Sequence, residues 1–170
     1  IVETNANPIS VAVFATVRCC SRVRPSYSDP INKPFRNKEV VVQNRAFFPE
    51  SIAPPLGAYA HGVEIPTNSK ITFTAGQVGI DPNGNVPKDF VSQAENAWNN
   101  CMKILEHNGM RMKDVVKINH FITDTANLPA YNEVRTRFLG KDKPASTLLI
   151  VAGLARPDLL IEVEMVAAKP

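Results

Sequence analysis

The segment Leu160–Ala167, near the end of the chain, constrains the fold more than any other part of the sequence. It has the sequence Leu-Ile-Glu-Val-Glu-Met-Val-Ala, and successive side chains of a strand point to opposite faces. One face is wholly apolar and comprises Ile161, Val163, Met165 and Ala167. The other face comprises Glu162 and Glu164 together with Leu160 and Val166. We therefore expect helices to pack on the first face, and solvent, a partner subunit or a binding site to cover the second.

Two helices are predicted from apolar periodicity. Residues 89–107 have a helical period, with Gly109 as the expected stop and Gln93 outside the apolar stripe; the stripe comprises Phe90, Ala94, Ala97, Cys101 and Leu105. A second helix begins at Pro129, a residue favoured in the first turn, and ends at Gly140. Strands are predicted at 39–43, 58–65, 71–75, 115–122, 147–151 and 160–167. This order predicts an α+β domain in which both helices pack on one face of a mixed sheet.

The charge distribution separates residues 1–38 from residues 39–170. The first segment has six basic and two acidic residues and four prolines, whereas the second has 13 basic and 14 acidic residues. Residues 1–38 are therefore expected to be an N-terminal extension that shares few core contacts with the domain 39–170. Its apolar start followed by Arg and Ser without acids is typical of an organelle transit segment, and a disordered or adventitious extension fits as well. The expected compartment is the cytoplasm, or a mitochondrion or other organelle if the segment is a transit peptide.

Composition excludes several classes of protein. Hydrophobic residues make up 44% and charged residues 21% of the 170, as in ordinary globular domains, and no apolar run approaches the roughly 18 residues of a membrane span. The three cysteines and three histidines lack the spacing of a metal site. The near-neutral domain has no basic surface signature for nucleic acid.

The chemical roles of individual polar residues stay open at this point. Glu162 and Glu164 are roughly 6–7 Å apart along a strand, which would suit a glycosidase-like acid/base pair, but nothing else in the chain supports that chemistry. A solvated charged face is the simpler interpretation. His120 lies among apolar residues and is expected to be a packed, hydrogen-bonded histidine rather than a catalytic one. Cys101 is expected to act as a small hydrophobic residue.

The order of short motifs along residues 40–168 resembles the RidA/YjgF family of reactive-intermediate deaminases. The motifs are Ala53-Pro-Pro-Leu-Gly-Ala-Tyr-Ala-His-Gly62, Thr72-Phe-Thr-Ala-Gly-Gln77, Asp81-Pro-Asn-Gly84, Val115-Val-Lys-Ile-Asn-His-Phe-Ile-Thr-Asp124, Tyr131-Asn132, Lys143-Pro-Ala145, Val151-Ala-Gly-Leu154 and Ile161-Glu-Val-Glu164. Each motif is weak alone, and eight in the family order are strong.

The resemblance implies a chorismate-mutase-like α+β subunit that forms a homotrimer. In such a trimer the sheets close into a central barrel, the helices lie outside, and clefts between subunits bind a small ligand. Active members hydrolyse imines and enamines to a 2-oxo acid and ammonia, without a metal or organic cofactor. By position, the resemblance implies catalytic roles for Tyr59, Asn132 and Glu162, with Glu162 orienting or activating water. Gly76 matches a glycine at which the backbone approaches the ligand.

Two positions depart from the family pattern. Ser146 replaces the arginine that follows Pro-Ala, and Ala75 replaces the usual serine before Gly76. A serine offers one neutral hydrogen bond but no positive charge, so a carboxylate would lose a charged contact worth about 1.5–3 kcal/mol. We therefore expect either a hydrolase with altered substrate preference or a trimer that binds small molecules without catalysis. Lys143 and Arg156 are candidates to replace the missing charge, and the ribonuclease function also associated with this family is disfavoured by the neutral domain.

Overall fold

The computed structural model describes residues 42–170, which lie within the unit Glu39–Pro170. The N-terminal extension 1–38 lies outside the described residues, and so does most of the strand expected at 39–43. Within residues 42–170, four strands precede helix α1: β1 (Arg45–Phe47), β2 (Gly62–Glu64), β3 (Lys70–Phe73) and β4 (Gln77–Val78). The remainder comprises α1 (Phe90–His107), β5 (Val115–Ile122), α2 (Leu128–Leu139), β6 (Ala145–Ile150) and β7 (Ile161–Lys169), with short 3-10 turns at Met112–Asp114 and Thr125–Asn127.

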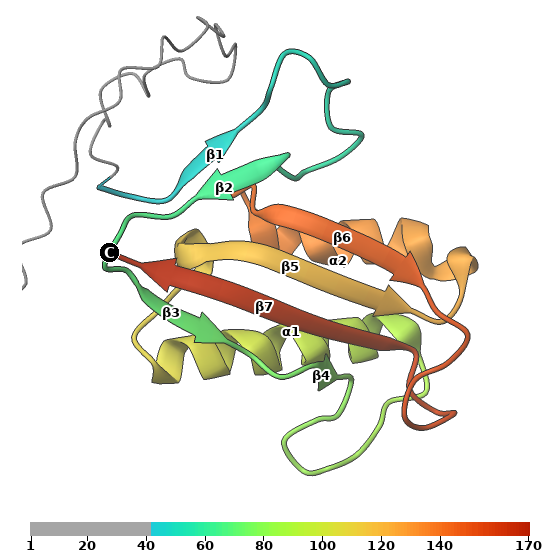
Figure 1. Cartoon of the computed structure of the whole chain (residues 1–170). Helices are drawn as coiled ribbons and strands as arrows, with labels where there is room; N and C mark the ends of the chain where they lie inside the picture. The colour runs from blue at the N-terminus through green and yellow to red at the C-terminus, as the bar shows by residue number, and fades with distance from the viewer. Residues whose placement is uncertain (1–41) are drawn as a thin grey trace, which may run out of the picture. The chain divides into compact units, whose positions relative to one another are not determined.

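The main sheet is mixed, and β7 lies at its centre (Figure 1). Its order is β3-β7-β5-β6, and β4 also pairs with β7. β7 is antiparallel to β3, β4 and β5, whereas β5 and β6 are parallel and joined through α2. Both helices lie on the same side of this sheet, and β1 and β2 form a separate antiparallel ribbon. The expected α+β domain with two helices on one face of a mixed sheet is thus confirmed.

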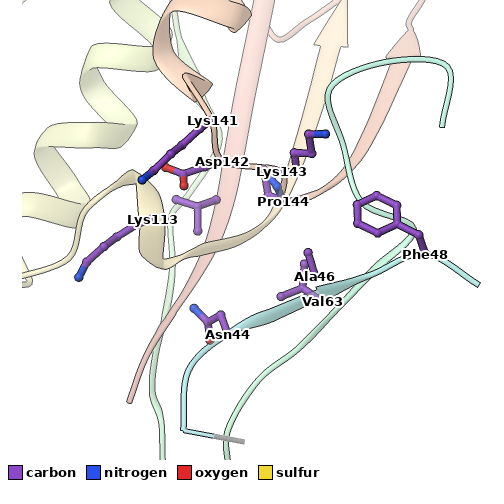
Figure 2. Close-up of a pocket in the computed structure, with 10 residues that line it drawn as sticks. Asn44, Ala46, Phe48, Val63, Lys113, Lys141, Asp142, Lys143 and Pro144 are labelled. Carbon is purple, nitrogen blue, oxygen red and sulfur yellow. The ribbon is translucent and has the colours of Figure 1, made fainter. Parts of the chain in front are cut away.

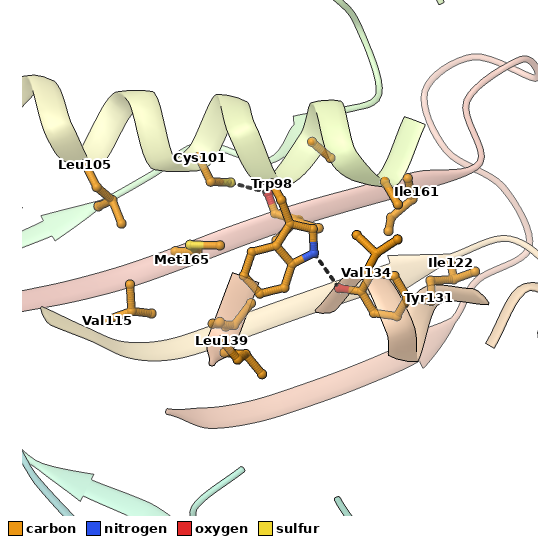
Figure 3. Close-up of a cluster of buried hydrophobic side chains, with 14 of the residues drawn as sticks. Trp98, Cys101, Leu105, Val115, Ile122, Tyr131, Val134, Leu139, Ile161 and Met165 are labelled. Carbon is orange, nitrogen blue, oxygen red and sulfur yellow. Dashed lines mark hydrogen bonds between the residues drawn. The ribbon is translucent and has the colours of Figure 1, made fainter. Parts of the chain in front are cut away.

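The apolar face of β7 forms the floor of the core. Ile161, Val163, Met165 and Ala167 are at most 1% exposed, and α1 packs on them through the predicted stripe. The ring of Trp98 stacks on Phe138 of α2 with centroids 5.1 Å apart, which joins the two helices. Figure 3 shows this cluster between the helices and the sheet.

Cys101 behaves as the small buried residue that the sequence predicts. It is fully buried, and its Sγ donates a hydrogen bond to the carbonyl of Val163 at 3.3 Å (Figure 3). Burial is the main cause that raises the pKa of its thiol to about 12, so the unreactive neutral form dominates at physiological pH.

A chain of buried polar side chains crosses the core beneath α2. The indole N–H of Trp98 donates to the Tyr131 hydroxyl at 3.2 Å, and that hydroxyl contacts Nδ1 of His120. Nε2 of His120 lies 3.0 Å from Oγ of Ser146. His120 is 1% exposed, as a packed, hydrogen-bonded histidine should be. Its burial, helped by the positive charges of Arg135 and Lys117, lowers its pKa to about 3.

Three expectations about the elements need correction. Within the described residues the first strand is Arg45–Phe47, and residues 42 and 43, the described part of the strand expected at 39–43, are not in a strand. The strand expected at 58–65 is reduced to Gly62–Glu64, because the segment after Pro54 and Pro55 bends and keeps only a bridge at Ala60. Gln93, placed outside the apolar stripe, is completely buried: its amide donates to the carbonyls of Pro87 and Asp158 and accepts from the N–H of Leu160, each at 2.8 Å. A buried amide with all these bonds is as acceptable in a core as an apolar residue.

The neutral buried state of His120 predicts a pH-dependent stability. In the unfolded chain a histidine takes up a proton below about pH 6.5, but the folded chain resists protonation down to about pH 3. The contribution of His120 to the free energy of unfolding is therefore complete above about pH 6.5. Below that pH it falls by up to about 1.4 kcal/mol for each pH unit. Urea unfolding of the wild type and of His120→Gln between pH 7.5 and 5 should show the steeper fall in the wild type. Equal slopes would contradict this account of His120.

Candidate functional site

The link between β3 and β4 is a β-bulge that brings Gly76 to β7. Phe73 pairs with Val166, and Gln77 pairs with Val163. The chain therefore advances four residues from β3 to β4 while β7 advances only three, which is the definition of a bulge. Thr74 fixes the start of the bulge, because its N–H donates to the carbonyl of Met165 and its Oγ1 accepts from the N–H of Met165, both at 2.9 Å. The extra residue lies in the pair Ala75–Gly76.

Gly76 lies directly against the carboxylate of Glu162. A Cβ added at Gly76 would lie 1.7 Å from Oε1 of Glu162, which no real side chain tolerates. Only a glycine therefore lets the backbone and this carboxylate occupy their present places. Ala75, Gly76 and Glu162 form a group on the open face of the sheet, which we call the carboxylate half-site.

A second group lies at the start of β6. Ala60 forms a parallel bridge with Ala145, and its N–H donates to the carbonyl of Pro144 at 3.1 Å. This bridge places Tyr59 and its loop beside the strand that begins just before Ser146. The hydroxyl of Tyr59 accepts from the N–H of Leu56 at 3.3 Å. Asn132 lies on α2 and is exposed, whereas the preceding residue, Tyr131, is buried in the core. Tyr59, Asn132 and Ser146 constitute the α2–β6 half-site.

One copy of the chain does not bring the two half-sites together. Ser146 pairs with Ile118, and Glu162 pairs with Phe121 on the other side of β5. Two strand spacings and three residues along the strands separate their backbones by roughly 14 Å. The side chains also point to opposite faces: Ser146 contacts the buried His120 on the helix face, whereas Glu162 lies on the open face. A site containing all six predicted residues therefore needs a second surface.

The open face has the character of a surface that another protein surface covers. Phe73 is 74% and Leu149 is 49% exposed, and both lie on the face of the sheet that carries Glu162 and Glu164. Glu164 accepts a hydrogen bond from Asn119 at 2.7 Å. Large exposed apolar side chains rimmed by polar ones are typical of an interface.

Neither of the two basic residues proposed to replace the missing arginine lies free at the α2–β6 half-site. Arg156 forms a two-bond ion pair with Asp158. Lys143 lines a cavity of about 310 Å³ between the β1–β2 ribbon and the loop after α2 (Figure 2). In that view Lys143 extends on the side of Phe48, away from Lys113 and Lys141.

The structure reveals two polar atoms at this half-site that the sequence analysis did not single out. Within residues 42–170, Nε of Arg135 and Nδ1 of His61 are buried and have no hydrogen-bond partner. Arg135 follows Asn132 by three residues on α2, so the two share one side of the helix. That spacing was the available sequence signal. His61 forms an edge-to-face ring pair with Tyr59 at 6.4 Å.

The described part of the chain has neither a cluster of metal-binding side chains nor a helix that could span a membrane. Residues 42–170 contain no group of three or more His, Cys, Asp or Glu side chains that could hold a metal ion. No helix within the same range is long and apolar enough to cross a membrane.

Comparison with known proteins gives matches over most of the chain. A family model described as Endoribonuclease L-PSP matches residues 50–169. A RutC family protein from Pyrococcus abyssi is 34% identical over 124 residues, which is 72% of this chain and 94% of the relative. A protein from Dermatophagoides farinae named 2-iminobutanoate/2-iminopropanoate deaminase is 30% identical over 114 residues, 66% of this chain and 86% of the relative.

Solved structures show the same fold. The Rid family protein YyfB from Yersinia pestis, of unknown function, has a TM-score of 0.66 and 29% identity, covering 74% of this chain and 98% of its own. Escherichia coli TdcF, solved with bound serine, has a TM-score of 0.57 and 28% identity, covering 74% and 99% of the two chains.

The contact between Gly76 and Glu162 predicts an asymmetry between two glycines. Gly76→Ala should lower the free energy of unfolding by about 0.5–1.5 kcal/mol, because the new methyl group must push the Glu162 side chain out of its present rotamer. Gly153→Ala is the matched control, since a Cβ there meets no atom within 4 Å. Chemical denaturation of both variants measures the difference. Equal stabilities would mean that Gly76 is not held against Glu162.

Proposed function

Because the chain belongs to the RidA/YjgF family, we propose that it is an imine- or enamine-hydrolysing deaminase with altered substrate preference. The observation that most supports this function is the carboxylate of Glu162 held against the glycine backbone of the bulge. Relatives of known name agree with it: one is named 2-iminobutanoate/2-iminopropanoate deaminase and another, from Acinetobacter baylyi, 3-aminoacrylate deaminase RutC.

The proposed reaction needs a positioned water and a base. Water adds to the imine carbon, and Glu162 accepts a proton from that water as the new C–O bond forms. That proton then goes to the nitrogen to give a carbinolamine. A second proton moves from the carbinolamine hydroxyl to the amine as the C–N bond breaks, so that ammonia leaves and the carbonyl product forms. An enamine first needs a proton at carbon, for which a hydroxyl such as that of Tyr59 is suited. Asn132 contributes a neutral amide that can orient the substrate.

The altered preference follows from Ser146. Its hydroxyl engages Nε2 of the buried His120 and points to the helix face of the sheet. It therefore supplies no positive charge to a ligand carboxylate, which removes a contact worth about 1.5–3 kcal/mol. The same observation favours a second candidate function, a trimer that binds a small molecule without turning it over.

The description of the family model also names an endoribonuclease. We do not propose that activity, because residues 39–170 have 13 basic and 14 acidic residues and thus no excess charge to bind phosphates.

The two half-sites also support a proposal about assembly. A homotrimer would let the carboxylate half-site of one copy face the α2–β6 half-site of the next, with small-molecule clefts at each interface. It would also cover Phe73 and Leu149.

Light scattering tests the assembly. At micromolar concentration the mass should be three times the 18.7 kDa of the chain. Phe73→Glu should shift the mass toward the monomer, because it would bury a charge in the proposed interface, whereas Lys103→Glu on the surface of α1 should not. A monomeric wild type would contradict the trimer.

Activity is tested with imines generated by an amino-acid oxidase and trapped by semicarbazide. The wild type should reduce trapping, and Glu162→Gln should abolish that effect because the amide cannot accept the proton. Glu164→Gln is the matched control: it lies on the same face two residues away and is bonded to Asn119. Glu164→Gln should keep most of the activity. If the wild type fails with every imine tested yet binds the 2-oxo acid products, the non-catalytic alternative holds.

A further inference from the structure

Arg135 lies in an unusual position for an arginine. Its Nε is buried without a hydrogen-bond partner, and among residues 42–170 it takes part in no ion pair. The side chain as a whole is only partly buried, so a ligand can reach the rest of the guanidinium. Buried donors of charged groups are nearly always satisfied, because leaving one unpaired costs about 1–3 kcal/mol or more. An arginine with an unsatisfied buried donor at a candidate site is therefore a candidate for binding an anion.

The surroundings of Arg135 belong to the α2–β6 half-site. Its Nη2 lies 3.5 Å from the position that a Cβ of Gly57 would take, and the ring of Tyr59 lies 3.9 Å from that same position. The guanidinium thus packs against the loop that holds Tyr59. Asn132 precedes it by one turn of α2.

The charge of Arg135 also reaches the place where the resemblance locates an anchor. Its positive field contributes to the lowered pKa of His120, whose Nε2 contacts Ser146. Because His120 stays neutral and Ser146 has no charge, neither competes with a ligand for the guanidinium or adds a second cation. Glu95, the only carboxylate bonded to an α2 arginine in the described region, pairs with Arg137 instead.

We propose that Arg135 binds the carboxylate of the substrate, from α2 rather than from β6. The substrate class is then a small imino or enamino acid whose carboxylate lies toward Gly57 and Tyr59. A guanidinium can form two parallel hydrogen bonds to a carboxylate, and the unpaired Nε–H is one of the donors suited to that geometry. The identity of the reacting group, an imine or enamine, rests on the proposed function. The contact between Arg135 and a carboxylate does not depend on it.

Binding of a stable probe tests the contact separately from catalysis. Calorimetry with 2-oxobutanoate and with its uncharged amide, 2-oxobutanamide, should show that the wild type binds the acid roughly 10- to 100-fold more tightly. Arg135→Gln should lose that preference and leave amide binding unchanged. Arg135→Lys should weaken acid binding several-fold, because it keeps the charge but not the fork. Arg137→Gln, which changes an exposed arginine of the same helix, should bind both probes like the wild type.

The outcomes distinguish this proposal from the proposed function. A wild type that does not prefer the acid overturns the role of Arg135, as does acid binding that survives in Arg135→Gln. If Arg135→Gln does not fold, the test rests on the preference of the wild type for the acid and on Arg135→Lys. Acid binding that is as tight in Arg135→Lys as in the wild type overturns the proposal. An Arg135-dependent preference without imine turnover would support the anion contact and contradict the deaminase. Imine turnover that is unchanged in Arg135→Gln would support the deaminase and contradict the anion contact.

Discussion

The alternation along β7 is the constraint on which the rest of the structure depends. The side chains of its apolar face, Ile161, Val163, Met165 and Ala167, are at most 1% exposed and receive α1, whereas Glu162 and Glu164 point to the other face. Since β7 pairs with β3, β4 and β5, its two-sided character is imposed on the whole sheet. A one-residue slip would bury both carboxylates and expose the core, so the register is strongly fixed. The bulge at Ala75–Gly76 uses that fixed register to bring a glycine backbone to Glu162.

The second constraint is the buried polar chain from Trp98 through Tyr131 and His120 to Ser146. It satisfies three polar side chains inside an apolar core and fastens α2 to β5 and β6. It also engages the hydroxyl of Ser146 with the core, so this serine offers neither a charge nor a free hydroxyl to a ligand anion. Stability and ligand binding thus compete at this position. Arg135 lies on α2, outside this buried polar chain, and its Nε has no partner. It could therefore bind a ligand anion without disturbing the core.

The sequence predicts much of this arrangement because the relevant patterns are local. β5 coincides with the predicted 115–122, and α1 begins and ends within one residue of the expected positions apart from its cap. β7 is displaced by one or two residues from 160–167. Short edge strands are harder, because β1 and β2 depend on pairing with each other rather than on their own periodicity. Gln93 was misplaced because its burial depends on backbone partners from distant segments, such as Asp158, that periodicity cannot reveal.

The candidate site was harder to predict than the fold. The residues were identified by motif, but their division between two faces of the sheet is a tertiary property. Arg135 was overlooked because its spacing of three residues from Asn132 is a weak signal; the burial of its Nε and the absence of a partner distinguish it from the surface residue Arg137.

The central claim is that a working site joins the half-sites of two copies. Complementation tests it most directly. Asn132→Ala and Glu162→Gln each damage one half-site, so each variant alone should be nearly inactive. When they are unfolded and refolded together in equal amounts, random trimers should contain both intact halves at roughly a quarter of their interfaces and recover about that fraction of wild-type activity. Mixed trimers with no more activity than the separate variants would contradict a site shared between copies.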